Sequence, residues 1–168
     1  MDRQYWGIPS EKTKYMSVIF SNKTSTSPQR YRHEIVNRFN SKFDLFGTGY
    51  NPIDDKYIGT KPYRYQVVVE NIFSGYVSEK GNDCFACGTI PIYYGNKKSN
   101  IYDYYDSDGF LIFETLDELE YIINNVANES YYDSRKEVIE KNCKLAINNS
   151  VHKVIWEYGI KDLIGENK

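Results

Sequence analysis

The sequence predicts an α/β fold in which a parallel sheet is flanked by helices. Short segments rich in β-branched and aromatic residues alternate along the chain with segments whose apolar residues recur at helical spacing. Helix-start signals precede some of the helical segments, as at Thr115, which Glu118 follows three residues later. Alternation of this kind favours parallel strands joined by crossover helices.

The first part of the chain is expected to hold three strands and one helix. The run of valines at 67–69 indicates a buried strand, and Ile35 and Phe39 share one face of a helix. Gly47 and Gly49 allow a turn with positive φ or a close backbone approach. The expected elements are a strand at 15–22, a helix at 31–40, a strand at 43–46, an irregular segment at 51–61 and a strand at 65–69.

The second part continues the alternation and ends in helices. Leu119 and Ile122 lie on one apolar stripe, and Ser134 with Glu137 repeats the helix-start signal. The expected elements are a helix near 80–87, a strand at 89–93, a polar loop at 96–109, a strand at 110–113, and helices at 116–125, from 134 to about 147, and at 151–163.

Length and composition limit the function. The 168 residues fit one domain over 1–168, with C-terminal helices within 134–165, and 17 Tyr and 8 Phe supply a core. A net charge of −2 argues against a nucleic-acid binder, which would carry a basic stripe. The sequence shows neither a secretion leader nor an apolar run near about 18 residues. We therefore expect a soluble, cytoplasmic protein without a membrane span.

The three cysteines, an odd number, are expected to be reduced thiols. Cys84 and Cys87 form a C-x-x-C motif, but no second pair follows, and His33 and His152 lie far away in the sequence. We therefore expect buried small residues on a helix face rather than a zinc site.

A candidate anion site follows the strand at 65–69. The strand leads to Glu70, and after a loop Ser78 can cap a helix whose free N–H groups attract anions. Lys80 adds a full positive charge, while Glu79 is suited to accept hydrogen bonds from ribose hydroxyls. The alternative is an ordinary solvated Glu-Lys pair at a helix start.

The same region carries a longer motif series, which consists of Val69-Glu70-Asn71, Tyr76-Val77-Ser78-Glu79-Lys80 and Thr89-Ile90-Pro91-Ile92-Tyr93-Tyr94-Gly95. This series resembles the signature of the α-1,3-fucosyltransferases, family 10 of the glycosyltransferases. The flanking segments 14–22, 43–47 and 109–123 are similar to strands and a helix of the same family, so the resemblance covers about 14–128.

The resemblance implies a Rossmann-like domain of the kind that forms the C-terminal half of a GT-B glycosyltransferase. In this family that half binds GDP-fucose, and the N-terminal half binds the glycan acceptor and supplies the catalytic base. Only the donor half is visible in this chain, so no catalytic residue is assigned. A homodimer or a separate acceptor-domain partner would have to complete the enzyme. The family's chemistry requires no metal and no other cofactor.

The resemblance also assigns the donor-binding residues. It places Lys80 on the diphosphate and Glu79 on the ribose. Asn71, Tyr76 and Val77 line the donor pocket in this interpretation, although a turn Asn and a core Tyr are ordinary alternatives.

An arginine early in the first helix neutralises the departing GDP in the family. Arg32 fits the family spacing better than Arg30, which remains the alternative, and either could instead be a solvated helix residue.

Other interpretations stay open. Asp106-Ser107-Asp108 is a D-x-D motif, which holds Mn²⁺ in glycosyltransferases of the GT-A fold, but a solvated turn is the expected alternative. His33 could replace the missing base, although a helix-surface histidine is expected. The chain could also be a GDP-sugar-binding module without catalysis, or a glycosyltransferase that uses another nucleotide sugar.

Overall fold

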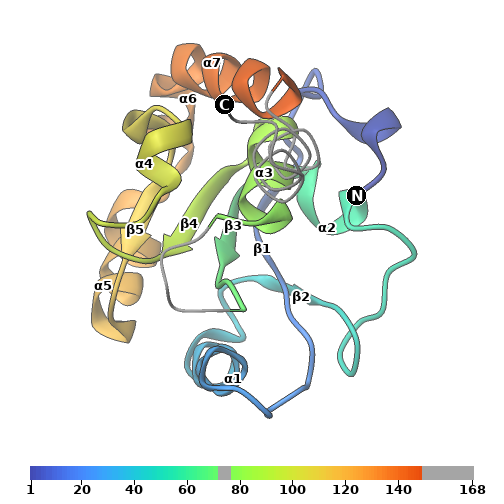
Figure 1. The fold of residues 1–168 in the computed structure, drawn as a ribbon, viewed down its shortest axis with the longest axis vertical. Coiled ribbons are helices and arrows are strands. Elements are labelled where there is room, and N and C mark those ends of the chain that lie inside the picture. Colours follow the sequence, from blue (N-terminus) through green and yellow to red (C-terminus); the bar gives the residue numbers. More distant parts are fainter. Residues whose placement is uncertain (72–76, 149–168) are drawn as a thin grey trace, which may run out of the picture.

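The fold is an open sheet of five parallel strands with helices on both faces (Figure 1). The computed structural model describes residues 1–71 and 77–148. The strand order is β2-β1-β3-β4-β5, and every neighbouring pair is parallel. The predicted α/β, Rossmann-like class is therefore confirmed. The strands are β1 (Lys14–Ile19), β2 (Asp44–Phe46), β3 (Tyr63–Val68), β4 (Ile90–Tyr94) and β5 (Leu111–Phe113).

The strand order reverses between β1 and β3. The chain first steps from β1 outward to β2, then returns past β1 to β3 and continues through β4 to β5. Val18 of β1 is paired with Val67 of β3, so the two strands end at the same edge of the sheet. In doubly wound sheets, ligands bind beyond the carboxyl ends of the strands at such a reversal.

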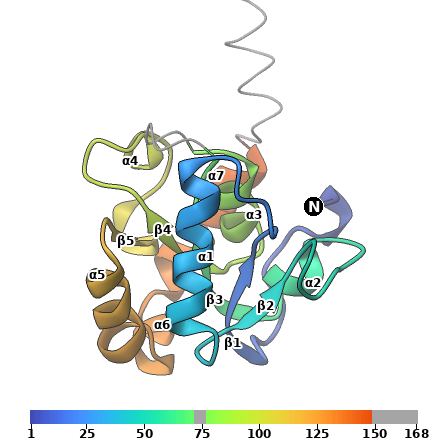
Figure 2. The ribbon, with the colours of Figure 1, turned by 90° about the horizontal axis from the view of Figure 1, so that it is seen from below.

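Helices cover both faces of this sheet (Figures 1 and 2). The α-helices are α1 (Ser27–Phe39), α2 (Tyr57–Thr60), α3 (Glu79–Ala86), α4 (Ile101–Tyr104), α5 (Leu116–Tyr121), α6 (Glu129–Ser134) and α7 (Lys136–Asn148). Short 3-10 turns occur at Arg3–Tyr5 and Ser107–Gly109, and α5 continues as a π-helical segment at Ile122–Val126. None of the helices in the described ranges is long and apolar enough to cross a membrane.

Alternate residues of β3 face two separate cores. Val67 packs with Ile35 of α1 and Leu119 of α5 in the larger core. Val68 packs on the other face with Phe85 of α3. Both faces of a parallel strand are covered by its crossover helices, which explains the unbroken run of valines.

Several element boundaries differ from the predictions. The first helix begins at Ser27 rather than 31, because Thr26 and Gln29 form a capping box around its first turn. The start signal assigned to Ser134 is wrong: Ser134 ends α6, and its hydroxyl donates to the carbonyl of Tyr131 at 2.7 Å. The first strand stops at Ile19 rather than 22.

Two segments expected to lack regular structure contain short helices. The segment 51–61 includes α2, and the loop 96–109 includes α4 and a 3-10 turn. The expected positive φ is confirmed at Gly47, where a Cβ would lie 1.9 Å from the carbonyl oxygen of Phe20. The helix expected at 151–163 lies outside the described residues.

A buried lysine joins the amino ends of three strands. The Lys12 ammonium donates to the carbonyls of Lys61 and Cys87 and to the hydroxyl of Thr89, each at 2.8 Å. The single proton of the Thr89 hydroxyl is directed at the carbonyls of Thr60 and Tyr63, so its oxygen accepts from Lys12. All three partners of the ammonium are therefore acceptors and suit its charged form. Burial opposes this preference and lowers the pKa of Lys12 to about 7.

This lowered pKa predicts a pH-dependent contribution to stability. Above about pH 7 the folded protein releases the Lys12 proton, whereas the unfolded chain keeps it up to its ordinary pKa of 10.5. Between about pH 7 and pH 8.5, the free energy of unfolding should therefore rise by about 1–2 kcal/mol relative to that of Lys12→Met. Urea unfolding at several pH values measures this difference. Burial raises the pKa of the three cysteines in both folded proteins, so ionisation of these cysteines in the unfolded chain affects both pH profiles. Parallel pH profiles of the two proteins would contradict the prediction.

Candidate functional site

The candidate site lies beyond the carboxyl ends of β1 and β3, at the reversal of the strand order. Three elements bring side chains to it. Glu70 and Asn71 lie just beyond the end of β3, Arg32 projects from α1, and Glu79 and Lys80 lie in the first turn of α3. The fold thus brings Arg32 close to Glu70, Asn71 and the start of α3, which are distant from it in the sequence. Tyr76, also assigned to the donor pocket, lies outside the described residues.

Arg32 connects α1 to the end of β3. Its side chain is buried, with 5% exposed, and its Nη2 donates to the carbonyl of Val69 at 2.6 Å and to Oδ1 of Asn71 at 2.8 Å. The guanidinium also lies 5.7 Å from the ring centroid of Phe20. Burial lowers the pKa of Arg32, and the charges of nearby carboxylates oppose this shift, so the guanidinium remains a fixed positive charge.

The structure brings Arg32, and not Arg30, to the site. Arg30 is exposed, and its Nη1 donates to the carbonyl of Thr24 at 3.1 Å in the loop before α1. Its Nη2 donates to the hydroxyl of Ser27. Arg30 therefore holds its own loop and helix start together, while Arg32 reaches the residues that follow β3.

Glu70 is a central residue of this site, and the sequence analysis gave it no binding role. It is 4% exposed, and its Oε1 accepts from the backbone N–H of Ser78 at 2.8 Å. Its Oε2 accepts from the Ser78 hydroxyl and from the Lys80 ammonium, the latter at 3.3 Å. A hydrogen bond from the Tyr93 hydroxyl also reaches this carboxylate, and the pKa of Tyr93 is raised by burial and by the charge of Glu70.

These contacts fix the start of α3. Ser78 is the N-cap, and its hydroxyl accepts from the backbone N–H of Lys80 at 3.3 Å. Val77 precedes it with its side chain in the core beneath α3 and its N–H bonded to Oδ1 of Asn100. The signal for Glu70 in the sequence was a charged residue directly after a buried strand, eight residues before an N-cap.

Glu79 lies between two lysines. Its Oε1 is 3.2 Å from the Lys80 ammonium and 3.6 Å from that of Lys56, which directly precedes α2. Burial raises the pKa of Glu79, but the charges of Lys80 and Lys56 and the hydrogen bonds of the carboxylate lower it further, to about 2. Glu79 therefore stays ionised and acts only as a hydrogen-bond acceptor at neutral pH.

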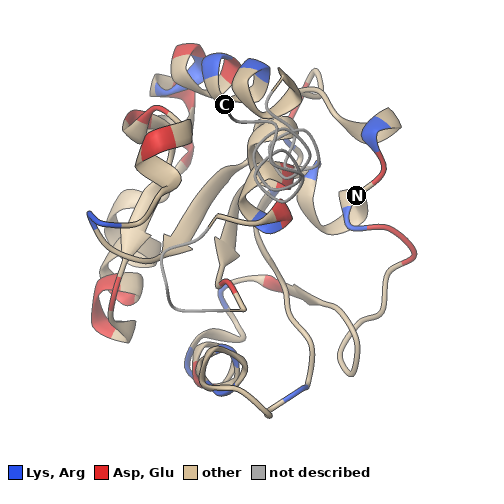
Figure 3. Cartoon of the chain, viewed as in Figure 1, with Lys and Arg blue, Asp and Glu red and all other residues tan. Residues whose placement is uncertain are grey.

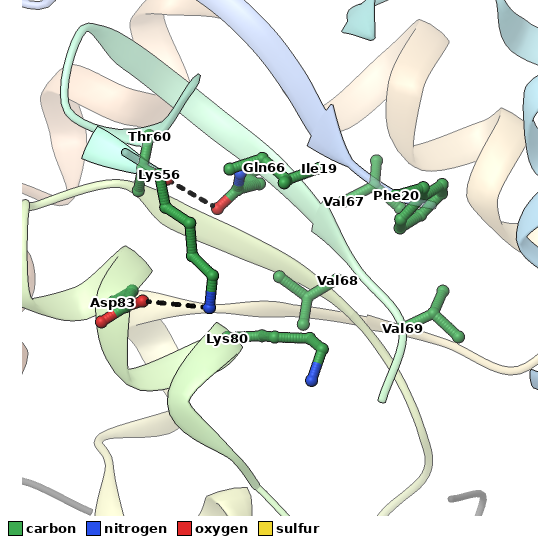
Figure 4. Close-up of a pocket in the computed structure, with 10 residues that line it drawn as sticks. All are labelled: Ile19, Phe20, Lys56, Thr60, Gln66, Val67, Val68, Val69, Lys80 and Asp83. Atoms are coloured by element: carbon green, nitrogen blue, oxygen red, sulfur yellow. Dashed lines mark hydrogen bonds and ion pairs between the residues drawn. The ribbon is translucent and has the colours of Figure 1, made fainter. Parts of the chain in front are cut away.

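A small pocket of about 60 Å³ adjoins this group of charges (Figure 4). Lys56, Lys80 and Asp83 line one side, and the apolar floor includes Phe20, which directly follows β1, and Val68 of β3. Figure 3 shows positive and negative segments next to each other at the start of α3. The pocket has room for a single anionic group, whereas whole small-molecule ligands generally occupy several hundred Å³.

The other candidate residues have structural partners. Asp106 of the D-x-D motif caps a 3-10 turn, and its Oδ2 lies 2.7 Å from the Lys141 ammonium. Cys84 and Cys87 are buried free thiols, as expected. His33 is half-buried between the Tyr50 hydroxyl and the carbonyl of Lys23. Within residues 1–71 and 77–148, no cluster of three or more His, Cys, Asp or Glu side chains is suited to a metal ion.

Neither models of known protein families nor the sequences of curated proteins match this chain. The functional interpretation therefore depends on the chemistry of the site. That site combines a buried arginine, a lysine at a helix start and an ionised glutamate between two lysines, all beside the ends of β1 and β3.

The buried position of Glu70 predicts a large effect of its removal. In Glu70→Gln, an amide N–H₂ group replaces one acceptor oxygen, so donors of Ser78 or Lys80 lose their partner in a buried site. We expect the free energy of unfolding to fall by about 2–3 kcal/mol in urea titrations. The control is Glu129→Gln, which removes an exposed partner of Arg64 and should change stability little. Equal effects of the two substitutions would contradict the assignment.

Proposed function

We propose that this chain is the donor-binding domain of a glycosyltransferase and that its donor is GDP-fucose. The observation that carries the proposal is the convergence of Arg32 and Lys80 at the ends of β1 and β3. Two fixed cations from different helices, at the position where doubly wound sheets bind ligands, suit the diphosphate of a nucleotide sugar. The resemblance of this region to the α-1,3-fucosyltransferases supports GDP-fucose as the donor.

The cations also suit the chemistry of glycosyl transfer. When the bond between the sugar and the diphosphate breaks, negative charge builds up on the departing GDP. Arg32 is held by two hydrogen bonds before any ligand arrives, so it would stabilise that charge without reorganising. Glu79, ionised beside Lys80, would accept hydrogen bonds from the ribose hydroxyls. Fucose would pass with inversion to a hydroxyl of a glycan that contains N-acetylglucosamine or glucose.

The acceptor and its base would come from elsewhere. A general base needs a pKa near the working pH, and Glu79 has a pKa of about 2. Glu70 is buried and faces the Lys80 ammonium. Burial raises the pKa of Asp83, but this carboxylate is held between the Lys56 ammonium and the Met1 amino group. These observations support a base from a second copy of the chain or from a separate acceptor domain. They equally favour the second candidate function, a GDP-sugar-binding module that performs no catalysis.

Calorimetric titration tests the donor assignment. We expect GDP and GDP-fucose to bind, and UDP-N-acetylglucosamine to bind at least tenfold more weakly. Lys80→Ala and Arg32→Lys each remove charge-assisted hydrogen bonds, worth about 1.5–3 kcal/mol, and should weaken GDP binding about 10- to 100-fold. Arg30→Ala is the matched control on the same helix and should bind as the wild type does.

Thermal unfolding of each variant separates loss of the site from loss of the fold. Failure of every nucleotide to bind the folded wild type would overturn the proposal. Preferential binding of GDP-mannose or of a uridine nucleotide would replace GDP-fucose as the donor. Binding of GDP-fucose with no transfer in the presence of candidate acceptors and partner domains would favour the non-catalytic module.

A further inference from the structure

Two lysines from different parts of the chain share one oxygen atom. Lys56 precedes α2 and Lys80 lies in the first turn of α3, yet both ammonium groups lie within 3.6 Å of the same atom, Oε1 of Glu79. Figure 4 shows both side chains reaching the same pocket, with Asp83 bonded to Lys56. An anionic oxygen between two ammonium groups is the arrangement that a bound phosphate would adopt.

We propose that Lys56 and Lys80 form a binding site for a diphosphate oxygen, a position that the carboxylate of Glu79 occupies in the ligand-free protein. This two-lysine pocket deepens the proposed function, on which it rests for the identity of the nucleotide. It adds Lys56, which lies outside every motif of the sequence, to the residues that bind the ligand.

The exposure of the carboxylates shows which of them can leave. The Glu79 side chain is 51% exposed and can turn toward solvent, where its charge is readily hydrated. Asp83 is only 7% exposed and lies 3.9 Å from Lys56, so it stays in place and keeps Lys56 directed at the pocket. Glu70 holds Lys80 in the same way from the other side. An incoming phosphate therefore displaces Glu79 and leaves both lysines held by buried carboxylates.

The apolar floor of the pocket favours the replacement of the Glu79 carboxylate by a phosphate. Ile19, Phe20 and Val68 are apolar and line the pocket beneath the two lysines. In a nucleotide sugar the diphosphate carries one negative charge on each phosphate group, two charges in all. Apolar walls lower the local dielectric and strengthen the attraction of these charges to the two ammonium groups. Once displaced, Glu79 remains beside the nucleotide and is free to accept hydrogen bonds from its ribose. The same residue thus neutralises the two lysines in the ligand-free protein and contacts the ribose when the nucleotide is bound.

Inorganic pyrophosphate is the probe for this proposal, because it provides a diphosphate group without base or ribose. Calorimetric titration at low ionic strength should show that Lys56→Met and Lys80→Met each weaken pyrophosphate binding at least tenfold. Glu79→Gln removes the internal competitor and should tighten it about three- to tenfold. Lys14→Met is the matched control, because Lys14 forms a similar lysine–carboxylate pair with Asp44 at the amino ends of the strands. It should leave binding unchanged.

The outcomes separate this inference from the proposed function. If GDP-fucose binds but Lys56→Met changes neither its affinity nor that of pyrophosphate, Lys56 does not bind the diphosphate. The two-lysine proposal is then wrong, while the donor assignment stands. If pyrophosphate depends on both lysines but GDP binds no more tightly, the pocket stands and the nucleotide assignment is wrong. Weaker pyrophosphate binding by folded Glu79→Gln would also overturn the pocket, because Glu79 would then assist the anion rather than compete with it.

Discussion

Burial of both faces of β3 is the constraint on which the site depends. Val67 and Val68 pack into separate cores on opposite sides of the sheet, so helices must cover the strand on both sides. The strand then delivers Glu70 to a position that is only 4% exposed. A carboxylate buried there needs donors and a counter-charge, and the start of α3 supplies them through Ser78 and Lys80. The packing of one strand thereby determines the position of Lys80 at the edge of the sheet.

The charges of the site form a chain of pairs that alternate in sign. Glu70 bonds Lys80, Lys80 bonds Glu79, and Glu79 bonds Lys56. The buried members have fixed partners, while the most exposed carboxylate lies between two cations. Such a chain keeps the cations in position in the absence of ligand. In the proposed exchange, Glu79 is the one carboxylate that a bound phosphate would replace. Arg32 differs from the lysines because its contacts are a carbonyl and an amide oxygen, which leave its positive charge uncompensated by direct ion pairing.

Most of the fold could be predicted from local patterns. The valine run at 67–69 and the helical spacing of Ile35 and Phe39 identified elements that the structure contains. The capping box at Thr115 also marked the start of α5 correctly. The predicted element boundaries were wrong where competing local hydrogen bonds determined where a helix begins. Ser134 resembles an N-cap in sequence, but its hydroxyl bonds back to the preceding turn of α6. Short helices such as α2 contain too few residues for their apolar side chains to show a helical period.

By itself the sequence determined the class of fold and the residues adjacent in the chain that form the start of α3. These follow from hydrophobic period and capping chemistry, which act over a few residues. Only the tertiary structure decided that Arg32 rather than Arg30 reaches the site, that Glu70 is buried against Lys80, and that Lys56 shares an oxygen of Glu79. Those contacts join segments separated by ten to forty residues, and their geometry follows from strand order and helix packing, which no local pattern encodes.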